Sequence, residues 1–260
     1  MKFNREFANQ IIDDLINCVD TASKEIMQIY NSDNFETSDK ADGSPLTLAD
    51  KASNQIITEG LKKITPDIAV ISEETFEDTI LKALPNLYWL VDPLDGTREF
   101  INKNDEFTVN IALIEDRKPV FGIVAAPVFE KCWHGSIFDN YHSDKSIPDV
   151  LRIVMSKSHK SDNDKSFLNY LNEKGVNYKI IEKGSSLKLC AIADNEADIY
   201  PRFGPTSEWD IAAAHSVLSA YGGCVLKVDD FSDLSYAKKD SILNPVSYTH
   251  LRAHESPMYR

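Results

Sequence analysis

The spacing of apolar residues divides the chain into helices and strands. Apolar residues recur at helical spacing from residue 3 to residue 29, which predicts a long amphipathic first helix. A polar loop over residues 31–45 follows, and a second helix is predicted to begin at Thr47 with Leu48, Ala52 and Ile56 on its apolar face. Short apolar runs at residues 68–72 and 87–91 predict two buried strands that each lead into acidic residues.

The remainder of the chain predicts further strands and then an alternation of strand and helix. Strands are expected over residues 108–114, 120–125 and 132–138, and polar residues 139–149 mark a boundary. Beyond it we predict strand 151–155, helix 162–173, strand 178–181, helix 186–193, strand 198–200, helix 210–220 and strand 224–227. The pattern is typical of a layered α/β protein with an N-terminal half over residues 1–139 and a C-terminal half over residues 150–245.

The last stretch, residues 246–260, does not continue this pattern. It has no apolar period, follows Asn244-Pro245 abruptly and holds two of the six histidines. Its amino-acid sequence is typical of translated adapter or vector sequence, and an ordinary disordered tail is the alternative. We therefore leave it out of the predicted fold as a suspected non-native tail.

Composition narrows the class of function. Of the 260 residues, 42% are apolar and 27% are charged, as in ordinary soluble globular proteins. The net charge of −13 argues against a nucleic-acid polymer or an anionic membrane surface as partner, since both need basic surfaces. The four cysteines are scattered without paired spacing, which favours free thiols in a reducing cytoplasm. No signal peptide is recognised, and no apolar run approaches the roughly 20 residues of a membrane span.

The run from Trp89 to Thr97 carries the strongest chemical signal. An apolar strand leads into Asp92 and Asp95, which flank a proline that fixes the turn between them. Such a turn can aim both carboxylates and the Leu94 carbonyl into one pocket of hard oxygen ligands, which suits Mg²⁺. Gly96 allows close approach of a phosphate, and Thr97 offers a hydroxyl beside it. Because carboxylates alone would repel phosphate, the run indicates a metal-dependent phosphatase; the alternative is an Asp-Pro turn whose second aspartate caps a helix.

Three further acidic residues are candidates. Glu73 follows a buried strand and could be a third carboxylate, although a Glu-Glu pair there is more often a solvated strand end. Asp210 precedes an alanine-rich run, where by itself it would be an N-cap. Four carboxylates suffice for two cations about 3.5–4 Å apart. Asp50 is a surface acid in isolation, but with Thr97 it could orient and deprotonate an attacking water.

The candidate basic groups come late in the sequence. Ser185 stands at a predicted helix start with Lys188 one turn on, which is a plausible second phosphate site. Arg202 lies between a strand and a turn, where a lone arginine is slightly more often structural, and His159 is equally ambiguous. No Ser-His-Asp triad, P-loop or GxGxxG motif competes with this interpretation.

In combination, these motifs resemble the inositol monophosphatase superfamily. The resemblance lies in residues 92–97, in Glu73 with its preceding Ile-Ser, and in Trp209-Asp210 with the alanine-rich helix after them. Residues 43–50, 97–100 and 200–206 are similar to the CysQ branch of 3'(2'),5'-bisphosphate nucleotidases, and the likeness runs from about residue 4 to residue 245. Family members end in an apolar segment that joins the sheet. Residues from 246 onward lack one, so we expect an exposed sheet edge and a loss of several kcal/mol of stability.

The resemblance implies an alternating αβαβα sandwich of the inositol monophosphatase and fructose-1,6-bisphosphatase type. It implies release of the 3'-phosphate of adenosine 3',5'-bisphosphate to give AMP, by a water that two Mg²⁺ ions activate, with two or three ions in each site. The implied metal ligands are Glu73, Asp92, the Leu94 carbonyl, Asp95 and Asp210. Asp50 and Thr97 would activate the water, and Leu94, Asp95, Gly96, Thr97 and Asp210 would border the substrate. Ser185, Lys188 and Arg202, with His159, would hold the phosphate that is retained.

The resemblance also implies Li⁺ inhibition, a role in sulfur assimilation and a small bisphosphorylated nucleotide as the partner. It implies a cytoplasmic enzyme, with peripheral attachment at the inner membrane face as a variant; the oligomeric state is not predicted. The choice among adenosine 3',5'-bisphosphate, its 2',5'-isomer and the sulfated form as substrate is left open.

One alternative function is that of an inositol or sugar monophosphate phosphatase, which would need no second anion clamp. Another is a non-catalytic regulator that binds nucleotide and metal, which would not need the Asp50–Thr97 pair.

Overall fold

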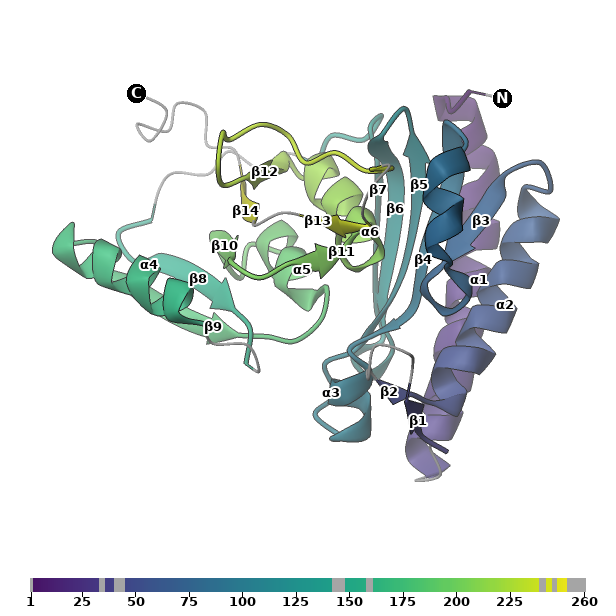
Figure 1. Ribbon diagram of the computed structural model, residues 1–260, viewed down its shortest axis with the longest axis horizontal. Helices are drawn as coiled ribbons and strands as arrows, with labels where there is room; N and C mark the ends of the chain where they lie inside the picture. The colour runs from purple at the N-terminus through teal and green to yellow at the C-terminus, as the bar shows by residue number, and fades with distance from the viewer. Residues whose placement is uncertain are drawn as a thin grey trace.

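The computed structural model describes residues 2–32, 36–39, 45–141, 148–157, 161–238, 242–244 and 247–251. Within them, five layers alternate between helix and sheet, in the order α1 with α2, a first sheet, α5 with α6, a second sheet, and α4 (Figure 1). The arrangement confirms the predicted layered α/β fold.

The bounds of the elements agree closely with the apolar pattern. The helices are α1 (Arg5–Ser32), α2 (Leu48–Ile64), α3 (Thr97–Ile101), α4 (Asp162–Glu173), α5 (Leu187–Ala193) and α6 (Glu208–Ala220). The first sheet contains β3 (Ala69–Ser72), β4 (Leu87–Asp95), β5 (Thr108–Glu115), β6 (Lys118–Ala126) and β7 (Lys131–Ser136). The second contains β8 (Leu151–Met155), β9 (Tyr178–Glu182), β10 (Ile199–Arg202), β12 (Gly223–Lys227) and β14 (Ser247–Leu251). The remaining elements are the pairs β1 (Ser38–Asp39) with β2 (Pro45–Leu46) and β11 (Thr206–Ser207) with β13 (Leu243–Asn244), and 3-10 turns at Glu73–Thr75, Asp78–Ala83 and Pro127–Phe129.

The first sheet is buried on both faces. Its order is β3-β4-β5-β6-β7, with β3 parallel to β4 and the other neighbours antiparallel. Along β4, Trp89 and Val91 pack in the core beneath α1 and α2, whereas Tyr88 and Leu90 pack in the core shared with α5 and α6. Both faces of β4 therefore need apolar residues, which is why its sequence reads as a continuous apolar run rather than as an alternation.

Helix α6 lies directly on the first sheet because the residues between them are small. A Cβ added to Gly122 of β6 would stand 2.2 Å from the Ala213 carbonyl oxygen, and one added to Gly135 of β7 would stand 2.7 Å from the Ala220 Cβ. Ala212 and Ala213 of the helix are buried. This close contact fixes the position of the first turn of α6, which carries Asp210.

Two elements begin or end differently from the sequence prediction. Strand β4 continues through Asp95, with an irregular register between Asp92 and Asp95 instead of a turn that follows the strand. Helix α6 begins at Glu208, so Asp210 is its third residue and the N-cap is Ser207. The N-cap interpretation of Asp210 is therefore wrong. The predicted loop over residues 31–45 contains β1 and the first residue of β2, and these two short strands pair with each other.

The expected loss of a final strand is also wrong. Residues 247–251 form β14, which lies between β12 and β10 in the second sheet and is antiparallel to both. Ser247 and Thr249 of β14 are buried. A strand is held by backbone hydrogen bonds on both sides, so this segment does not need the apolar period whose absence misled the prediction. Residues 247–251 therefore belong to the second sheet. The suspicion that residues 246–260 are not native stays a prediction.

A proline in β14 should therefore destabilise the fold. Thr249 faces both Tyr200 and Val225, and in Thr249→Pro the missing N–H would remove a hydrogen bond to one of these two strands while the ring crowds the same strand. We expect the free energy of unfolding to fall by about 3 kcal/mol, measured by urea denaturation. The control Thr249→Ser keeps the N–H and the hydroxyl and should lose far less. Equal stability of the proline variant and the wild type would show that β14 does not contribute to the fold.

Helices of the described residues are all too short or too polar to cross a membrane.

Candidate active site

The acidic turn at the end of β4 is fixed from two sides. The Asp92 carboxylate oxygen Oδ1 accepts a hydrogen bond from the Leu94 N–H at 3.1 Å. The Ser53 hydroxyl, from the buried face of α2, donates to the Pro93 carbonyl at 2.7 Å. Because neighbouring side chains and backbone hold this irregular stretch, both aspartates are presented at one end of the first sheet.

Gly96 allows the chain to turn from β4 into α3. Its φ of +96° lies in the left-handed region, and a Cβ there would stand 3.1 Å from the Glu106 carbonyl oxygen. A side chain at this position would therefore be both strained and crowded. Thr97 follows as the first residue of α3, with its hydroxyl 3.4 Å from the Leu94 carbonyl oxygen.

Asp50 and Thr97 meet as the sequence analysis anticipated. The Thr97 hydroxyl donates to Asp50 Oδ1 at 3.0 Å, although 47 residues separate them in the sequence. The other carboxylate oxygen, Oδ2, accepts the Thr47 N–H at 2.7 Å in the capping box of α2. Asp50 is 1% exposed, so the interpretation as a surface acid is wrong. The capping box holds one oxygen and leaves the other directed at Thr97.

Ser186 connects Asp95 with Asp210. Its N–H donates to Asp95 Oδ2 at 2.7 Å, and its hydroxyl donates to the Asp210 carbonyl at 2.7 Å. Asp210 Oδ2 in turn accepts the Ser207 N–H at 2.9 Å. A residue at the start of α5 thus joins the end of β4 to the first turn of α6. Sequence reasoning missed Ser186, and its only signal was its place beside Ser185 in a Gly-Ser-Ser turn.

The start of α6 is also held by a buried ion pair. Glu208, with no exposed surface, pairs with Lys238 and accepts the Ala237 N–H at 2.8 Å. Lys238 also donates to Asn244 Oδ1 at 3.0 Å, and Asn244 Nδ2 donates to the Ser207 carbonyl at 3.3 Å. These contacts fix the backbone immediately before Asp210.

The four predicted acidic ligands influence one another electrostatically. Burial raises the pKa of Asp92 well above its ordinary value, and the negative charges of Glu73, Asp95 and Asp210 raise it further. Burial likewise raises the pKa of Asp210, with Asp95 and Glu73 adding to the effect. Burial raises the pKa of Asp95 to about 6, although the Lys188 ammonium and the Ser186 N–H lower it. Each carboxylate therefore lies in a field that a cation would relieve.

This donor set suits a hard divalent cation. The set consists of the carboxylates and the Leu94 carbonyl, which lies near the Thr97 hydroxyl. Mg²⁺ prefers oxygen ligands of this kind. Among the described residues, no three acidic, histidine or cysteine side chains are already drawn together at metal-binding distances. Mutual repulsion between carboxylates opposes such convergence in the absence of a cation.

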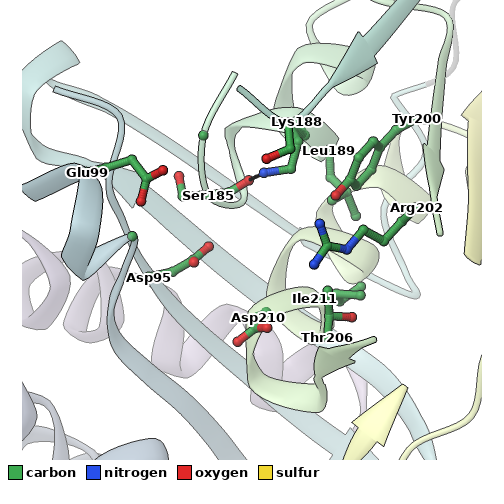
Figure 2. Close-up of a pocket in the computed structure, with 13 residues that line it drawn as sticks. Asp95, Glu99, Ser185, Lys188, Leu189, Tyr200, Arg202, Thr206, Asp210 and Ile211 are labelled. Carbon is green, nitrogen blue, oxygen red and sulfur yellow. Dashed lines mark hydrogen bonds between the residues drawn. The ribbon is translucent and has the colours of Figure 1, made fainter. Parts of the chain in front are cut away.

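A cavity of about 240 Å³ opens beside the acidic cluster. Figure 2 shows Asp95 and Asp210 on one side of it and the Lys188 and Arg202 side chains on the other. Lys188 is only 8% exposed, and its ammonium donates to the Ser185 carbonyl at 2.6 Å. The Arg202 guanidinium donates to the carbonyls of Gly204 and Pro205, both at 3.2 Å. The cavity therefore combines a negative wall with a positive wall.

Two hydroxyls on the wall of this cavity have no hydrogen-bond partner among the described residues. They are Ser185 Oγ and Thr206 Oγ1, and both are buried. Ser185 also has a φ of +40°, an uncommon conformation for a residue other than glycine. Because buried polar atoms are normally satisfied, these oxygens favour a polar ligand in the cavity.

Most of the predicted site residues thus come together, and residues that the sequence analysis did not single out join them. One group gathers around the end of β4 and consists of Asp50, Asp92, Leu94, Gly96 and Thr97. The negative charge of Glu73, which follows β3, raises the pKa of Asp92, after the larger effect of burial. His159 lies outside the described residues. Sequence reasoning did not single out Glu99, Tyr200 and Thr206, which also line the cavity. Their nearest signals were the runs over residues 97–100 and 200–206 that resemble the CysQ branch.

Comparison with known proteins identifies the family of the chain. Residues 8–256 match the model of the inositol monophosphatase family, so the match includes β14. The 3'(2'),5'-bisphosphate nucleotidase CysQ of Salmonella typhimurium is 41% identical over 235 residues, which cover 86% of this chain and 93% of that protein. CysQ of Escherichia coli strain K12 is 38% identical over 246 residues, or 90% of this chain and 97% of that protein.

A solved structure that resembles the chain belongs to the same family. The crystal structure of CysQ from Bacteroides thetaiotaomicron superposes with a TM-score of 0.80 at 32% identity, over 92% of this chain and 96% of that one. Family members are metal-dependent phosphatases, generally with Mg²⁺. Peripheral attachment to a membrane finds no support in these comparisons. The chain belongs to the inositol monophosphatase family and is similar over most of its length to CysQ members of that family.

Proposed function

We propose that the chain is a Mg²⁺-dependent phosphatase that converts adenosine 3',5'-bisphosphate to AMP and inorganic phosphate. The observation that carries the proposal is a single cavity with carboxylates on one wall and two cationic side chains on the other. A substrate with one phosphate would use the acidic wall alone, whereas a bisphosphate can engage both. The names of the curated relatives at 38% and 41% identity point to the same substrate class.

Glu73, Asp92, Asp95, Asp210 and the Leu94 carbonyl would hold the metal ions. Bound ions of this kind neutralise phosphoryl oxygens and lower the pKa of a water molecule. The pKa values of Asp92 and Asp210 are raised by burial and then by neighbouring negative charge, so a cation would stabilise the ionised form of both carboxylates. The number of ions, two or three, is part of the proposal.

Thr97 and Asp50 would position the attacking water and take its proton. The Thr97 hydroxyl donates to Asp50 Oδ1, so its lone pairs are available to accept a hydrogen bond from the water. As the water oxygen bonds to phosphorus, its proton passes to Thr97 Oγ1 and the Thr97 proton passes to Asp50 Oδ1. The bond from phosphorus to the 3'-oxygen breaks, and the leaving oxygen takes a proton from solvent. The products are AMP and inorganic phosphate.

Phosphate release from a small substrate panel tests the proposal. The panel contains adenosine 3',5'-bisphosphate, its 2',5'-isomer, the sulfated form, adenosine 3'-monophosphate and inositol 1-phosphate, each with Mg²⁺ and with EDTA. We expect the highest kcat/KM with a bisphosphorylated nucleotide. We expect no phosphate release from any substrate in EDTA. Highest kcat/KM with inositol 1-phosphate would establish the monophosphatase alternative, and no release from any substrate would establish the non-catalytic regulator.

Removing the positive charge of Lys188 should change selectivity. Lys188→Met keeps the aliphatic stem and removes a charge-assisted contact, which is worth about 1.5–3 kcal/mol. We expect kcat/KM for adenosine 3',5'-bisphosphate to fall roughly 10- to 100-fold, and that for adenosine 3'-monophosphate to change much less. Lys24→Met, on the exposed side of α1, is the control. An equal loss on both substrates would contradict a role in holding the second phosphate.

Raising the pH should lower the stability of the metal-free protein, and adding Mg²⁺ should raise it. A carboxyl group whose pKa is raised from 3.8 to about 6 by folding stabilises the fold below pH 3.8, and this contribution is lost as pH rises through 6. For Asp95, the loss in the metal-free protein is about 3 kcal/mol. Mg²⁺ binds the ionised group, so the rise in Tm on adding Mg²⁺ should be larger at pH 7.5 than at pH 5.

The control for this stability experiment is Asp95→Asn, measured in EDTA and in Mg²⁺. At pH 7.5 the neutral amide should make the metal-free protein more stable than the wild type, while much of the Mg²⁺-dependent rise in Tm disappears. If wild type and variant gained the same Tm from Mg²⁺ at both pH values, Asp95 would not be a ligand.

A further inference from the structure

Tyr200 lies between the two cationic side chains of the cavity. Tyr200 and Arg202 are two residues apart on β10, so both side chains point to the same side of the strand, and both line the cavity. Lys188 approaches from the first turn of α5, with its ammonium 5.6 Å from the centre of the Tyr200 ring. Figure 2 shows the phenol oxygen pointing toward the Arg202 guanidinium at the positive wall.

The surroundings keep the Tyr200 hydroxyl protonated and in place. The side chain is 4% exposed, so the ring is held by packing. Burial raises the pKa of Tyr200 well above its ordinary value, and the charges of Asp95 and Asp210 add to this against the lowering effect of Arg202. The hydroxyl therefore stays a donor throughout the pH range in which a phosphatase would work. A neutral donor between two cations is suited to an anion that carries several acceptor oxygens.

We propose that the Tyr200 hydroxyl is a specificity-determining group that donates a hydrogen bond to the phosphate which the enzyme leaves on its product. Lys188 and Arg202 supply the charge at this place, and the Tyr200 ring supports the Lys188 ammonium. The hydroxyls of Ser185 and Thr206, which find no partner within the part of the chain that the structure describes, line the same cavity and indicate a polar ligand there. The inference rests on the proposed function, since it assigns a residue to the second phosphate of a bisphosphate substrate.

The test compares Tyr200→Phe with wild type on two substrates that share the cleaved ester. Adenosine 3',5'-bisphosphate carries the second phosphate, and adenosine 3'-monophosphate lacks it. The phenylalanine keeps the ring under Lys188, so only the hydroxyl is lost. We expect kcat/KM for the bisphosphate to fall roughly 10-fold, mainly through KM, and kcat/KM for the monophosphate to stay within about 2-fold. Binding of AMP to the metal-free protein, measured by calorimetry, should weaken by a similar factor.

Tyr88→Phe is the matched control. Tyr88 is also a buried tyrosine, at 1% exposure, and its hydroxyl has no partner among the described residues and does not line the cavity. Removing the Tyr88 hydroxyl should leave kcat/KM for both substrates and the affinity for AMP unchanged.

The outcomes separate this inference from the proposed function. A wild-type enzyme that prefers the bisphosphate, with a Tyr200→Phe variant that keeps the whole preference, would overturn the role of Tyr200 alone. Equal losses on both substrates would make Tyr200 a structural residue and also overturn it. A wild-type enzyme without any preference for the bisphosphate would overturn the proposed function and this inference together.

Discussion

Asp95→Asn should lower kcat at saturating Mg²⁺ by about 1,000-fold while leaving the fold intact. Loss of one carboxylate ligand removes several kcal/mol of stabilisation of the charge on the transferred phosphoryl group, and each 1.36 kcal/mol is a factor of ten in rate. The amide keeps the shape of the side chain, and its oxygen can still accept the Ser186 N–H that now reaches Asp95 at 2.7 Å. Phosphate release and far-UV circular dichroism measure the two effects. We expect the same of Asp210→Asn, since Asp210 lies across the Ser186 bridge.

Asp194→Asn is the control for these variants. Asp194 is an exposed aspartate that follows α5 and accepts the Trp133 indole N–H at 2.8 Å, outside the cavity. An asparagine there can accept the same bond, so kcat should be unchanged. A wild-type kcat in Asp95→Asn at saturating Mg²⁺ would refute the metal assignment.

Thr97→Val should have a comparably large effect, a fall in kcat of roughly 100- to 10,000-fold, which is the usual contribution of a positioned proton acceptor. Valine keeps the branched shape but removes the hydroxyl that bonds to Asp50 Oδ1 at 3.0 Å. Because Thr97 is proposed to act on the water and not as a principal metal ligand, KM and the Mg²⁺ concentration for half-maximal activity should change little. Steady-state phosphate release at several Mg²⁺ concentrations separates these quantities.

Asp50→Asn tests whether the two residues act as one unit. Each single variant should lose nearly as much as the double variant, because groups that transfer one proton together are not additive. Thr58→Val provides the control, since its hydroxyl donates to the Asn54 carbonyl within α2, away from the site. Additive losses in the double variant would contradict the shared proton path.

Much of the fold could be predicted because local pattern and tertiary environment agree. The apolar run of β4 is buried on both faces, and the helical spacing in α1 matches its burial against the first sheet. The prediction failed at β14, where pairing on both sides decides the structure and the side-chain pattern is weak. It also misplaced the start of α6, because both Asp210 and Ser207 can cap a helix and only the packed structure selects Ser207.

The candidate site divides in the same way. The sequence by itself determined the acidic turn after β4, the glycine that allows it, and the kinds of oxygen and cationic groups available for a phosphate. Tertiary structure alone decided that Thr97 would meet Asp50 across 47 residues, that Asp95 would meet Ser186 across 91 residues, and that Tyr200 would stand between two cations. The physical reason is that a turn or a helix cap follows from interactions between neighbours in the chain. The meeting of distant side chains depends on how closely α6 packs on the first sheet and on which strands pair.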